Sequence, residues 1–241
     1  MIKNYLITAI RELRKRKFYT AINILGLSVS LTASILIILW VQDEQSFDKF
    51  HSDYEQIYKV NSHLDPEHNG SIWGGSPGPI GNYAQNVPEV DYATRVSQDD
   101  DVTLVNDMLK RPVTNMNIYY VDSNFFNMFH FPLQAGSLSG FQANYKQALI
   151  TPSTAEKLFS TQQVIGKTFR YQKDLFTVAG ILNDIPQNSS MQFDVVIPLG
   201  YHAQRFTKWG GNGKWKTIDE DMGNYSFSTY VKVKPHASAA L

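Results

Sequence analysis

The stretch FYTAINILGLSVSLTASILIILWV, residues 18–41, decides how the rest of the chain is arranged. No charged residue lies between Lys17 and Asp43, and aromatic residues stand near both ends of the stretch. The 25 positions between those two charges would form a helix about 37 Å long, which exceeds the ~30 Å hydrocarbon core of a bilayer. Aromatic rings at the ends of such a helix favour the headgroup region. The sequence therefore predicts a transmembrane helix over residues 18–42.

Two other interpretations of this stretch are a buried helix of a soluble core and a cleaved signal peptide. The apolar region of a signal peptide is about 7–15 residues long and ends at a cleavage site of small residues. Here the apolar run continues to Val41 and passes directly into QDEQ. We therefore expect a retained membrane helix.

Charge is distributed unevenly along the 241 residues, although the whole chain is formally neutral. Residues 1–17 contain six basic groups and one acid, so the remainder carries a net charge of −5. Because short basic flanks stay on the cytoplasmic side, we expect a cytoplasmic N-terminus and an extracytoplasmic main domain. The acidic balance of that domain gives no reason to expect nucleic-acid binding.

Residues 1–17 are predicted to form a basic amphipathic helix on the cytoplasmic side. The apolar residues on one face are Ile2, Tyr5, Leu6, Ala9, Ile10 and Leu13. Such a helix suits the surface of anionic membrane lipid, and docking of a cytoplasmic partner is the alternative.

A line of small residues follows one face of the predicted membrane helix. Its members are Asn23, Gly26, Ser30, Ala33 and Ser34, spaced by three or four positions or standing next to each other. Small side chains let a second helix approach closely in lipid, so we expect a helix-packing face here. Ordinary tolerance of small residues in a single span is the alternative.

Residues 43–58 keep a helical period beyond the membrane and contain neither Gly nor Pro. Phe47, Phe50, Tyr54 and Ile57 recur at three- or four-residue spacing. We predict a helical stalk in which this face couples motion by gripping a neighbouring helix. The alternative is that these rings cover the base of the main domain.

The remaining residues, 59–241, read as a mixed α+β domain of short strands and short helices. Helices are predicted over residues 79–86, 123–129 (with Ser123 as the cap) and 152–159, and strands over 92–96, 102–105, 113–121, 168–171, 176–182, 193–197 and 227–234. Residues 201–225 read as a long loop bearing Trp209 and Trp215, which either contact a partner or pack on their own domain.

No pattern of catalytic, cofactor-binding or metal-binding residues emerges, and the chain has no cysteine. Gly166, Lys167 and Thr168 resemble the end of a phosphate-binding loop, but that motif needs a glycine where Thr161 stands. We expect a turn before a strand, and no ATP hydrolysis by this chain.

Two clusters of metal-ligand type are expected to be solvated rather than occupied. His63, Asp65, Glu67 and His68 lie in a loop rich in Gly and Pro, which does not fix zinc geometry. Residues 99–101, three consecutive aspartates, are expected to form an exposed turn.

Several segments together resemble the MacB/FtsX-type ABC transporter permease family. They are EQSFDKFHSDYEQIYKV (44–60), YVDSNFFNMFHFPLQAG (120–136), QALITPSTAEKLF (147–159) and IGKTFRYQKDLFTVAGILNDIPQNSSMQFDVVIPL (165–199). The resemblance extends over nearly the whole chain and depends on the order and spacing of these segments.

The resemblance implies a non-catalytic permease subunit in the bacterial inner (plasma) membrane, without a cofactor. Its implied partners are a separate cytoplasmic ABC ATPase, a second permease copy or paralogue, membrane lipid, and a periplasmic adaptor or cargo. Motion driven by ATP would pass to the extracytoplasmic domain for export or lipoprotein release. The alternatives from other classes are a single-span membrane-anchored sensor or ligand-binding domain, and a membrane-anchored hydrolase.

The resemblance also implies a division of the extracytoplasmic core domain. A membrane-near β-α-β part would comprise residues 59–100 and 226–241, and an inserted part would comprise 101–225. Because residues 235–241 read as the start of a helix after a strand, we expect the domain to continue beyond Leu241.

Overall fold

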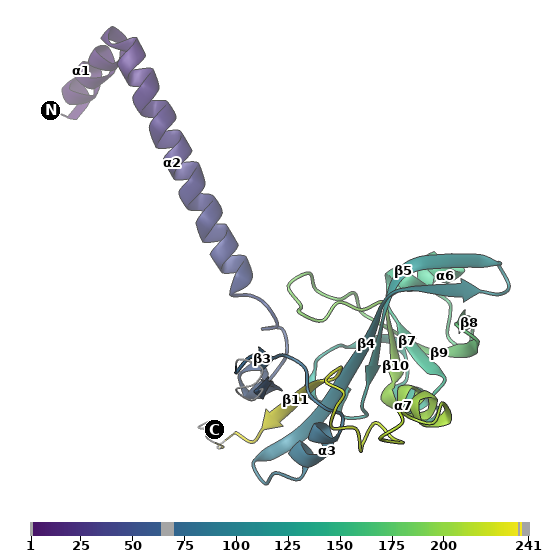
Figure 1. Cartoon of the computed structure of the whole chain (residues 1–241). Coiled ribbons are helices and arrows are strands. Elements are labelled where there is room, and N and C mark those ends of the chain that lie inside the picture. Colours follow the sequence, from purple (N-terminus) through teal and green to yellow (C-terminus); the bar gives the residue numbers. More distant parts are fainter. Residues whose placement is uncertain (1, 64–69, 236, 238–241) are drawn as a thin grey trace. The chain divides into compact units, whose positions relative to one another are not determined.

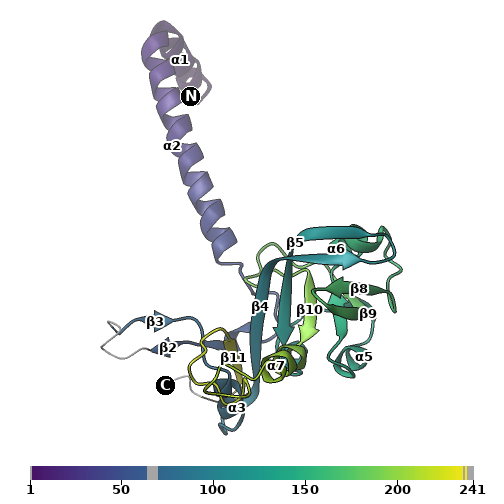
Figure 2. The same ribbon diagram turned by 45° about the vertical axis from the view of Figure 1, so that its right-hand side comes forward.

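The computed structural model describes residues 2–63, 70–235 and 237. The chain divides into two compact units, Met1–Phe47 and Asp48–Leu241, which we describe separately (Figures 1 and 2).

The first unit contains two helices, α1 (Ile2–Lys15) and α2 (Lys17–Glu44). They are separated at Arg16, whose φ of −110° and ψ of 56° interrupt the helical backbone. Among the described residues, α2 is the helix that is long and apolar enough to cross a membrane. None of its side chains is buried. The predicted apolar helix is therefore present, and it extends slightly beyond residues 18–42.

The predicted helical stalk over residues 43–58 is wrong. Helix α2 ends at Glu44, turns follow, and a short 3₁₀ helix (Tyr54–Gln56) leads into strand β1 (Ile57–Val60). Asp48 has a left-handed φ of 58°, which a continuous α-helix does not allow. Its backbone N–H donates to the carbonyl oxygen of Asn188 instead. Tertiary hydrogen bonds therefore override the local helical period.

A nine-stranded sheet forms the centre of the second unit. Its order is β1–β11–β4–β5–β10–β7–β9–β6, and β8 pairs with both β4 and β9. The strands are β4 (Val90–Asn106), β5 (Arg111–Val121), β6 (Leu133–Gly136), β7 (Gln147–Ile150), β8 (Thr168–Tyr171), β9 (Asp174–Leu182), β10 (Val195–Pro198) and β11 (Ser228–Val233). Strands β2 (Ser62–His63) and β3 (Ile72–Trp73) pair separately. The predicted α+β class is confirmed.

Strand β4 joins two differently organised halves of the sheet. Its first residues, Val90–Val96, pair with β11, Val96–Asn106 pair with β5, and the β4–β5 register shifts between Asp99 and Val102. Its last residues pair with β8, which closes a ring of strands β4, β5, β10, β7, β9 and β8. In both views the hairpin of β4 and β5 extends away from β11, with α6 beside it (Figures 1 and 2).

Short helices cover the sheet and complete two hydrophobic cores. They are α3 (Pro79–Gln85), α4 (Phe125–Met128), α5 (Leu138–Gln142), α6 (Pro152–Phe159) and α7 (Leu199–Lys208). Side chains of α6 and α7 pack in one core with Tyr120 and Phe176. Side chains of α4 and α5 pack in the other, against which Phe50 and Ile57 also lie.

Most of the predicted short elements are present, and three local predictions need correction. Helix α4 has Asn124 rather than Ser123 at its N-cap position, and no side chain caps it. The predicted loop 201–225 begins with most of α7, because buried Tyr201 and its neighbours supply a helical period. Asp99 lies in β4 and accepts hydrogen bonds from two tyrosines, so it is not part of an exposed turn.

The predicted division of the main domain near residue 100 falls inside β4, close to its register shift. Residues 48–241 cluster as one compact unit, so the division remains a prediction. Residues 236 and 238–241 lie outside the described part, and so does most of the predicted C-terminal helix start.

Candidate functional site

The segment that connects the apolar helix to the sheet is fixed to the second unit at several points. The carboxylate of Asp48 accepts a hydrogen bond from the backbone N–H of Ser190 at 2.9 Å. Asp53 forms an ion pair with Lys232 of β11 at 2.5 Å. Strand β1 then pairs with β11 in an antiparallel register. Residues 48–60 are therefore part of the folded domain rather than a free linker.

His51 is the most buried polar side chain of this linking segment, with 3% of its surface exposed. Its Nδ1 accepts a hydrogen bond from the backbone N–H of His130 at 3.0 Å. The rings of Phe50, Phe129 and Phe131 lie 4.1 to 5.1 Å away, centre to centre. Burial lowers the pKa of His51, and the charge of Asp48 opposes this only in part. The ring is therefore neutral at pH 7.

Because Nδ1 of His51 is an acceptor, the neutral ring carries its proton on Nε2. This Nε2 is buried and has no hydrogen-bond partner among the described residues. An unpaired buried donor is unfavourable by roughly 1–3 kcal/mol, so the atom marks a position where a partner would be stabilising.

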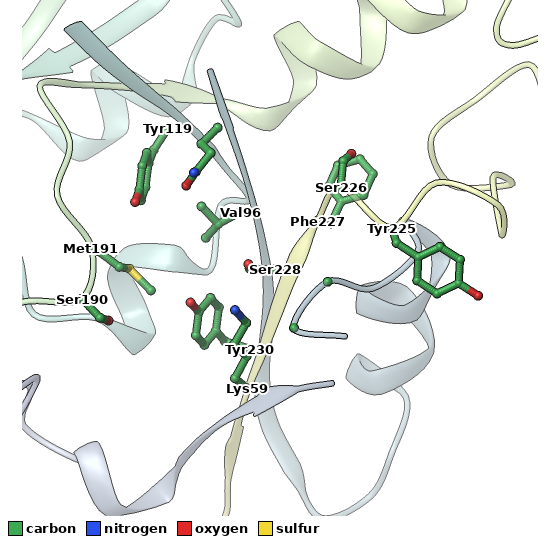
Figure 3. Close-up of a pocket in the computed structure, with 13 residues that line it drawn as sticks. Lys59, Val96, Tyr119, Ser190, Met191, Tyr225, Ser226, Phe227, Ser228 and Tyr230 are labelled. Carbon is green, nitrogen blue, oxygen red and sulfur yellow. The ribbon is translucent and has the colours of Figure 1, made fainter. Parts of the chain in front are cut away.

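Two adjoining cavities lie next to the linking segment. One has a volume of about 410 Å³ and includes Asp48 and His51 in its lining. The other has a volume of about 350 Å³ and includes Gln98, Tyr119 and the start of β11 (Figure 3). They share Lys59, Ser190, Met191 and Tyr230. We call the two together the Lys59 cleft.

Lys59 stands at the junction of the two cavities. In the sheet it pairs with Tyr230, which pairs in turn with Thr94 of β4. Its amino group lies 6.0 Å from the centre of the Tyr230 ring, and Figure 3 shows both side chains extending together into the cleft. In the part of the chain that the structure describes, no carboxylate lies within ion-pair distance of Lys59.

A buried arginine stabilises the sheet beside the cleft. Arg95 of β4 makes two hydrogen bonds to the carboxylate of Asp122, at 2.8 and 3.0 Å. It also contacts Asp219 at 2.5 Å and the carbonyl oxygen of Gly78 at 3.0 Å. These contacts use four of the five guanidinium N–H donors and give Arg95 a structural role.

A second polar cluster lies within the ring of strands. Asp99 accepts hydrogen bonds from the hydroxyls of Tyr120 and Tyr171, both at 2.7 Å. Burial and this carboxylate raise the pKa of Tyr120 far above its ordinary value. Burial lowers the pKa of the neighbouring His202. The tyrosines therefore remain protonated donors, which suits a structural role.

The structure separates the residues that were predicted to act in coupling. Phe50 and Ile57 pack against a hydrophobic core, whereas Phe47 and Tyr54 are each 40% exposed. The packing of Phe50 and Ile57 fits the alternative in which rings of this segment cover the domain. A single continuous stripe is not formed, because residues 43–58 are not one helix.

All five residues of the predicted helix-packing face are exposed on α2. The hydroxyls of Ser30 and Ser34 donate to the carbonyl oxygens of Gly26 and Ser30, each at 2.9 Å. These bonds satisfy the hydroxyls inside the helix, which makes the face compatible with lipid. Packing against a second helix remains a prediction.

The two tryptophans of the predicted contact site are not equally accessible. Trp209 follows α7 and is 69% exposed, with the guanidinium of Arg205 4.6 Å from its ring centre. Trp215 is half-buried and lies beside Lys214 and Gly223. The structure does not bring the two together in a shared contact, so their role in partner binding remains a prediction.

The other sequence motifs have structural explanations. Gly166 has a φ of 81° in the turn that precedes β8, so the segment 166–168 leads into a strand, as predicted. His63 lies in β2, and Asp65, Glu67 and His68 lie outside the described residues. No group of metal-ligating side chains occurs among the residues described.

The fold defines a class of protein in which an α+β domain follows a single apolar N-terminal helix. A family model described as the MacB-like periplasmic core domain matches residues 20–241. The chain belongs to this family, which places it among the ABC transporter permeases. The predicted family is therefore confirmed.

Solved structures show the same fold at low sequence identity. A domain of a protein described as a permease from Porphyromonas gingivalis has a TM-score of 0.64 and 23% identity, covering 78% of this chain and 79% of that one. The periplasmic region of MacB from Actinobacillus actinomycetemcomitans has a TM-score of 0.54 and 15% identity, with 76% of each chain covered.

A third structure is the extracellular domain of the noncanonic ABC-type transporter YknZ from Gram-positive bacteria. Its TM-score is 0.51 and its identity 14%, covering 75% of this chain and 83% of that chain. No curated protein matches the sequence.

Two residues that line the cleft, Tyr54 and Ile57, were selected from the sequence, but for a role in coupling. His51, Lys59 and Tyr230 were not selected. Lys59 and Tyr230 are 171 positions apart and meet only because β1 pairs with β11. The alternation of residues 227–234 was an available signal for β11, whereas β1 (IYKV) has no alternating pattern that would have indicated a strand.

Proposed function

We propose that the chain is part of the membrane (permease) subunit of an ABC transporter. A separate cytoplasmic ATPase would supply motion, and this chain would transmit it to the extracytoplasmic domain for export or lipoprotein release. Membership of the MacB-like family and the apolar helix α2 (Lys17–Glu44) support this proposal. The basic residues 1–17 support a cytoplasmic N-terminus in the inner membrane.

The observation that carries the proposal is the attachment of the linking segment. Asp48 binds the turn at residues 188–190, His51 is buried, and Asp53 pairs with Lys232. A displacement at the start of this segment would therefore move β1 and β11 instead of being absorbed by a loose connection. Closely packed elements transmit displacement because their interiors deform little.

The proposed partners follow from the first unit. The ATPase and a membrane-surface lipid layer would contact α1, and a second permease copy would pack on the small-residue face of α2. In this arrangement the chain supplies no nucleotide-binding residues.

The proposal is tested by following the domain during ATP turnover. The full permease would be purified with its ATPase, placed in lipid nanodiscs, and spin-labelled at a cysteine replacing exposed Ser139 in each of the two permease copies. Pulsed electron paramagnetic resonance would measure the distance between the labels without nucleotide and with ATP and vanadate. We expect the distance distribution to change with nucleotide.

Asp48→Gly with Asp53→Asn removes the carboxylate contact to Ser190 and the ion pair with Lys232, and glycine tolerates the left-handed backbone at residue 48. We expect this variant to bind the ATPase but to lose at least half of the nucleotide-dependent change. Asp107→Asn, which breaks an exposed ion pair with Arg170, is the matched control. A full change in the Asp48/Asp53 variant would reject transmission through the linking segment.

A further inference from the structure

We propose that the Lys59 cleft binds a small amphiphile that carries a single anionic group. This site goes beyond the proposed transmission of motion, because binding there requires neither ATP nor a second subunit. The argument depends on a lysine without an ion-pair partner, on the different chemistry of the two cavities, and on a buried donor in the wall of the cleft.

The cleft is lined by one lysine and one carboxylate, so its formal charges balance, but the lysine has no ion-pair partner among the described residues. Lys59 is shared by both cavities, and no carboxylate of the described residues pairs with it. Asp48 also lines the cleft, but its carboxylate already accepts hydrogen bonds from the N–H of Ser190 and the hydroxyl of Ser189, at 2.9 and 3.4 Å. A lysine ammonium in a partly enclosed site favours an anion as its partner.

The two cavities differ in the side chains that line them. The 410 Å³ cavity is walled mainly by apolar and aromatic groups, including Ile57, Phe129 and Met191. The 350 Å³ cavity presents an amide and hydroxyls, including those of Gln98, Ser226 and Ser228. Each volume lies within the range of roughly 300–1,000 Å³ that is usual for small-molecule sites. An occupant with its anionic group at Lys59 would thus place an apolar part in the 410 Å³ cavity and a polar part in the 350 Å³ cavity.

His51 supplies an independent observation. It lines the apolar cavity, and its buried Nε2–H has no partner among the described residues. An oxygen atom of the anionic group would satisfy this donor once a small movement of the cavity wall exposes it, because Nε2 itself is buried. The buried imidazole and the exposed lysine would then bind the same end of the occupant.

The side chains around the cleft can be followed in Figure 3. Tyr230 lies beside Lys59, and Tyr119 and Met191 line the same side of the cavity, whereas the ring of Tyr225 points away from it. Tyr225 contacts Trp73 edge to face at 5.8 Å, and Trp73 is 50% exposed. The rim next to Lys59 is therefore partly aromatic, which suits the entrance of an amphiphile.

The test uses the full chain in nanodiscs of zwitterionic lipid, with ¹³C-methyl-labelled methionine. The probes are octanoate and octyl phosphate, which distinguish a carboxylate from a phosphate, and octanol as the uncharged control. We expect the methyl resonance of Met191, assigned with a Met191→Leu variant, to shift saturably with an anionic probe. Octanol should bind at least tenfold more weakly, and the methyl of exposed Met222 should not shift.

Variants separate the cleft from general effects of charge. Lys59→Met keeps the length of the side chain and should weaken binding of the anionic probes about tenfold. Lys173→Met removes one exposed positive charge in the turn between β8 and β9 and should leave binding unchanged. Equal binding of octanol and octanoate, an unchanged affinity in Lys59→Met, or no shift at Met191 would each overturn the proposal. None of these results depends on the ATPase, so the proposed function is tested separately.

Discussion

At the residue scale, the ion pairs of the structure differ in burial and therefore in how much they affect stability. Only 8% of the Arg95 side chain is exposed, whereas Arg170 and its partner Asp107 are both about 40% exposed. Burial removes the hydration that would otherwise replace a lost partner, so a broken buried pair is much more unfavourable than a broken surface pair. The two arginines are therefore a natural comparison.

Replacing Arg95 by methionine should destabilise the second unit by roughly 2–4 kcal/mol, because the charge of Asp122 and the Gly78 carbonyl lose their buried partner. The half-exposed side chain of Asp219 keeps the value near the lower end. Urea unfolding of the full chain in detergent micelles would measure the change. Arg170→Met should lower stability by less than about 1 kcal/mol. Similar losses in the two variants would contradict the structural role of Arg95.

His51 makes the stability of the domain dependent on pH. Burial lowers the pKa of the folded state below the ordinary value of 6.5, with Asp48 opposing and His130 adding to the shift. Above pH 6.5 neither state takes up the proton, so folding is unaffected. As the pH falls through that value, the unfolded state binds a proton that the folded state does not, and the free energy of unfolding decreases.

His51→Asn should reduce the loss of stability between pH 7.5 and pH 5.5. Asparagine does not titrate, and its side-chain oxygen can replace Nδ1 as the acceptor of the His130 N–H. Urea unfolding at several pH values would give the slope. His202, whose pKa burial also lowers, should keep some pH dependence in this variant. His130→Gln removes the smallest contribution to the His51 shift and should therefore reduce the slope less than His51→Asn does.

At the scale of elements, the sequence pattern predicted correctly those helices that are fixed by contacts within their own segment. Helix α6 begins as predicted, because Pro152 occupies its first turn and the Thr151 hydroxyl accepts from the N–H of Thr154. Residues 43–58 have an equally clear period but do not form a helix. Their conformation is set by contacts to residues near 130, 190 and 232, which are far away in the sequence.

The candidate site could not be predicted for the same reason. The cleft is assembled from β1, β4, β5, β11 and the turn near Ser190, and no short motif connects these segments. The fold class and the apolar helix, by contrast, depend on composition and period within single segments. The helices and strands of such a domain can therefore be predicted from its sequence more readily than a cleft that forms between distant segments.

Gly136 at the end of β6 provides a prediction at this scale. Its φ is +95°, and an added Cβ would lie 2.3 Å from the carbonyl oxygen of Ala179. Gly136→Ala should destabilise the domain by more than about 2 kcal/mol, since backbone strain and a steric clash combine. Gly140→Ala in helix α5 meets nothing closer than 3.9 Å and should be neutral or stabilising by up to about 1 kcal/mol. Thermal unfolding followed by circular dichroism would compare them.

At the scale of the whole molecule, orientation in the membrane is the main prediction. The chain has no cysteine, so single cysteines can be introduced without background. A cysteine replacing exposed Ser139 should react with an impermeant thiol reagent in cells whose outer barrier is open to the reagent. A cysteine replacing Thr8 should react only after the inner membrane is permeabilised. Reaction of residue 8 alone in intact cells would reverse the proposed topology.

The pairing of β1 with β11 also constrains how the domain is made. Ile57 in β1 lies opposite Lys232 in β11. The first strand of the domain therefore pairs with a strand that lies far along the chain. If the chain is translocated from its N-terminal side, β1 stays unpaired while about 170 further residues emerge. Contacts of such long sequence separation form slowly and leave strand edges open to aggregation. Lowering the translocation rate should therefore increase misassembly of the linking segment more than misassembly of the ring of strands that β8 completes.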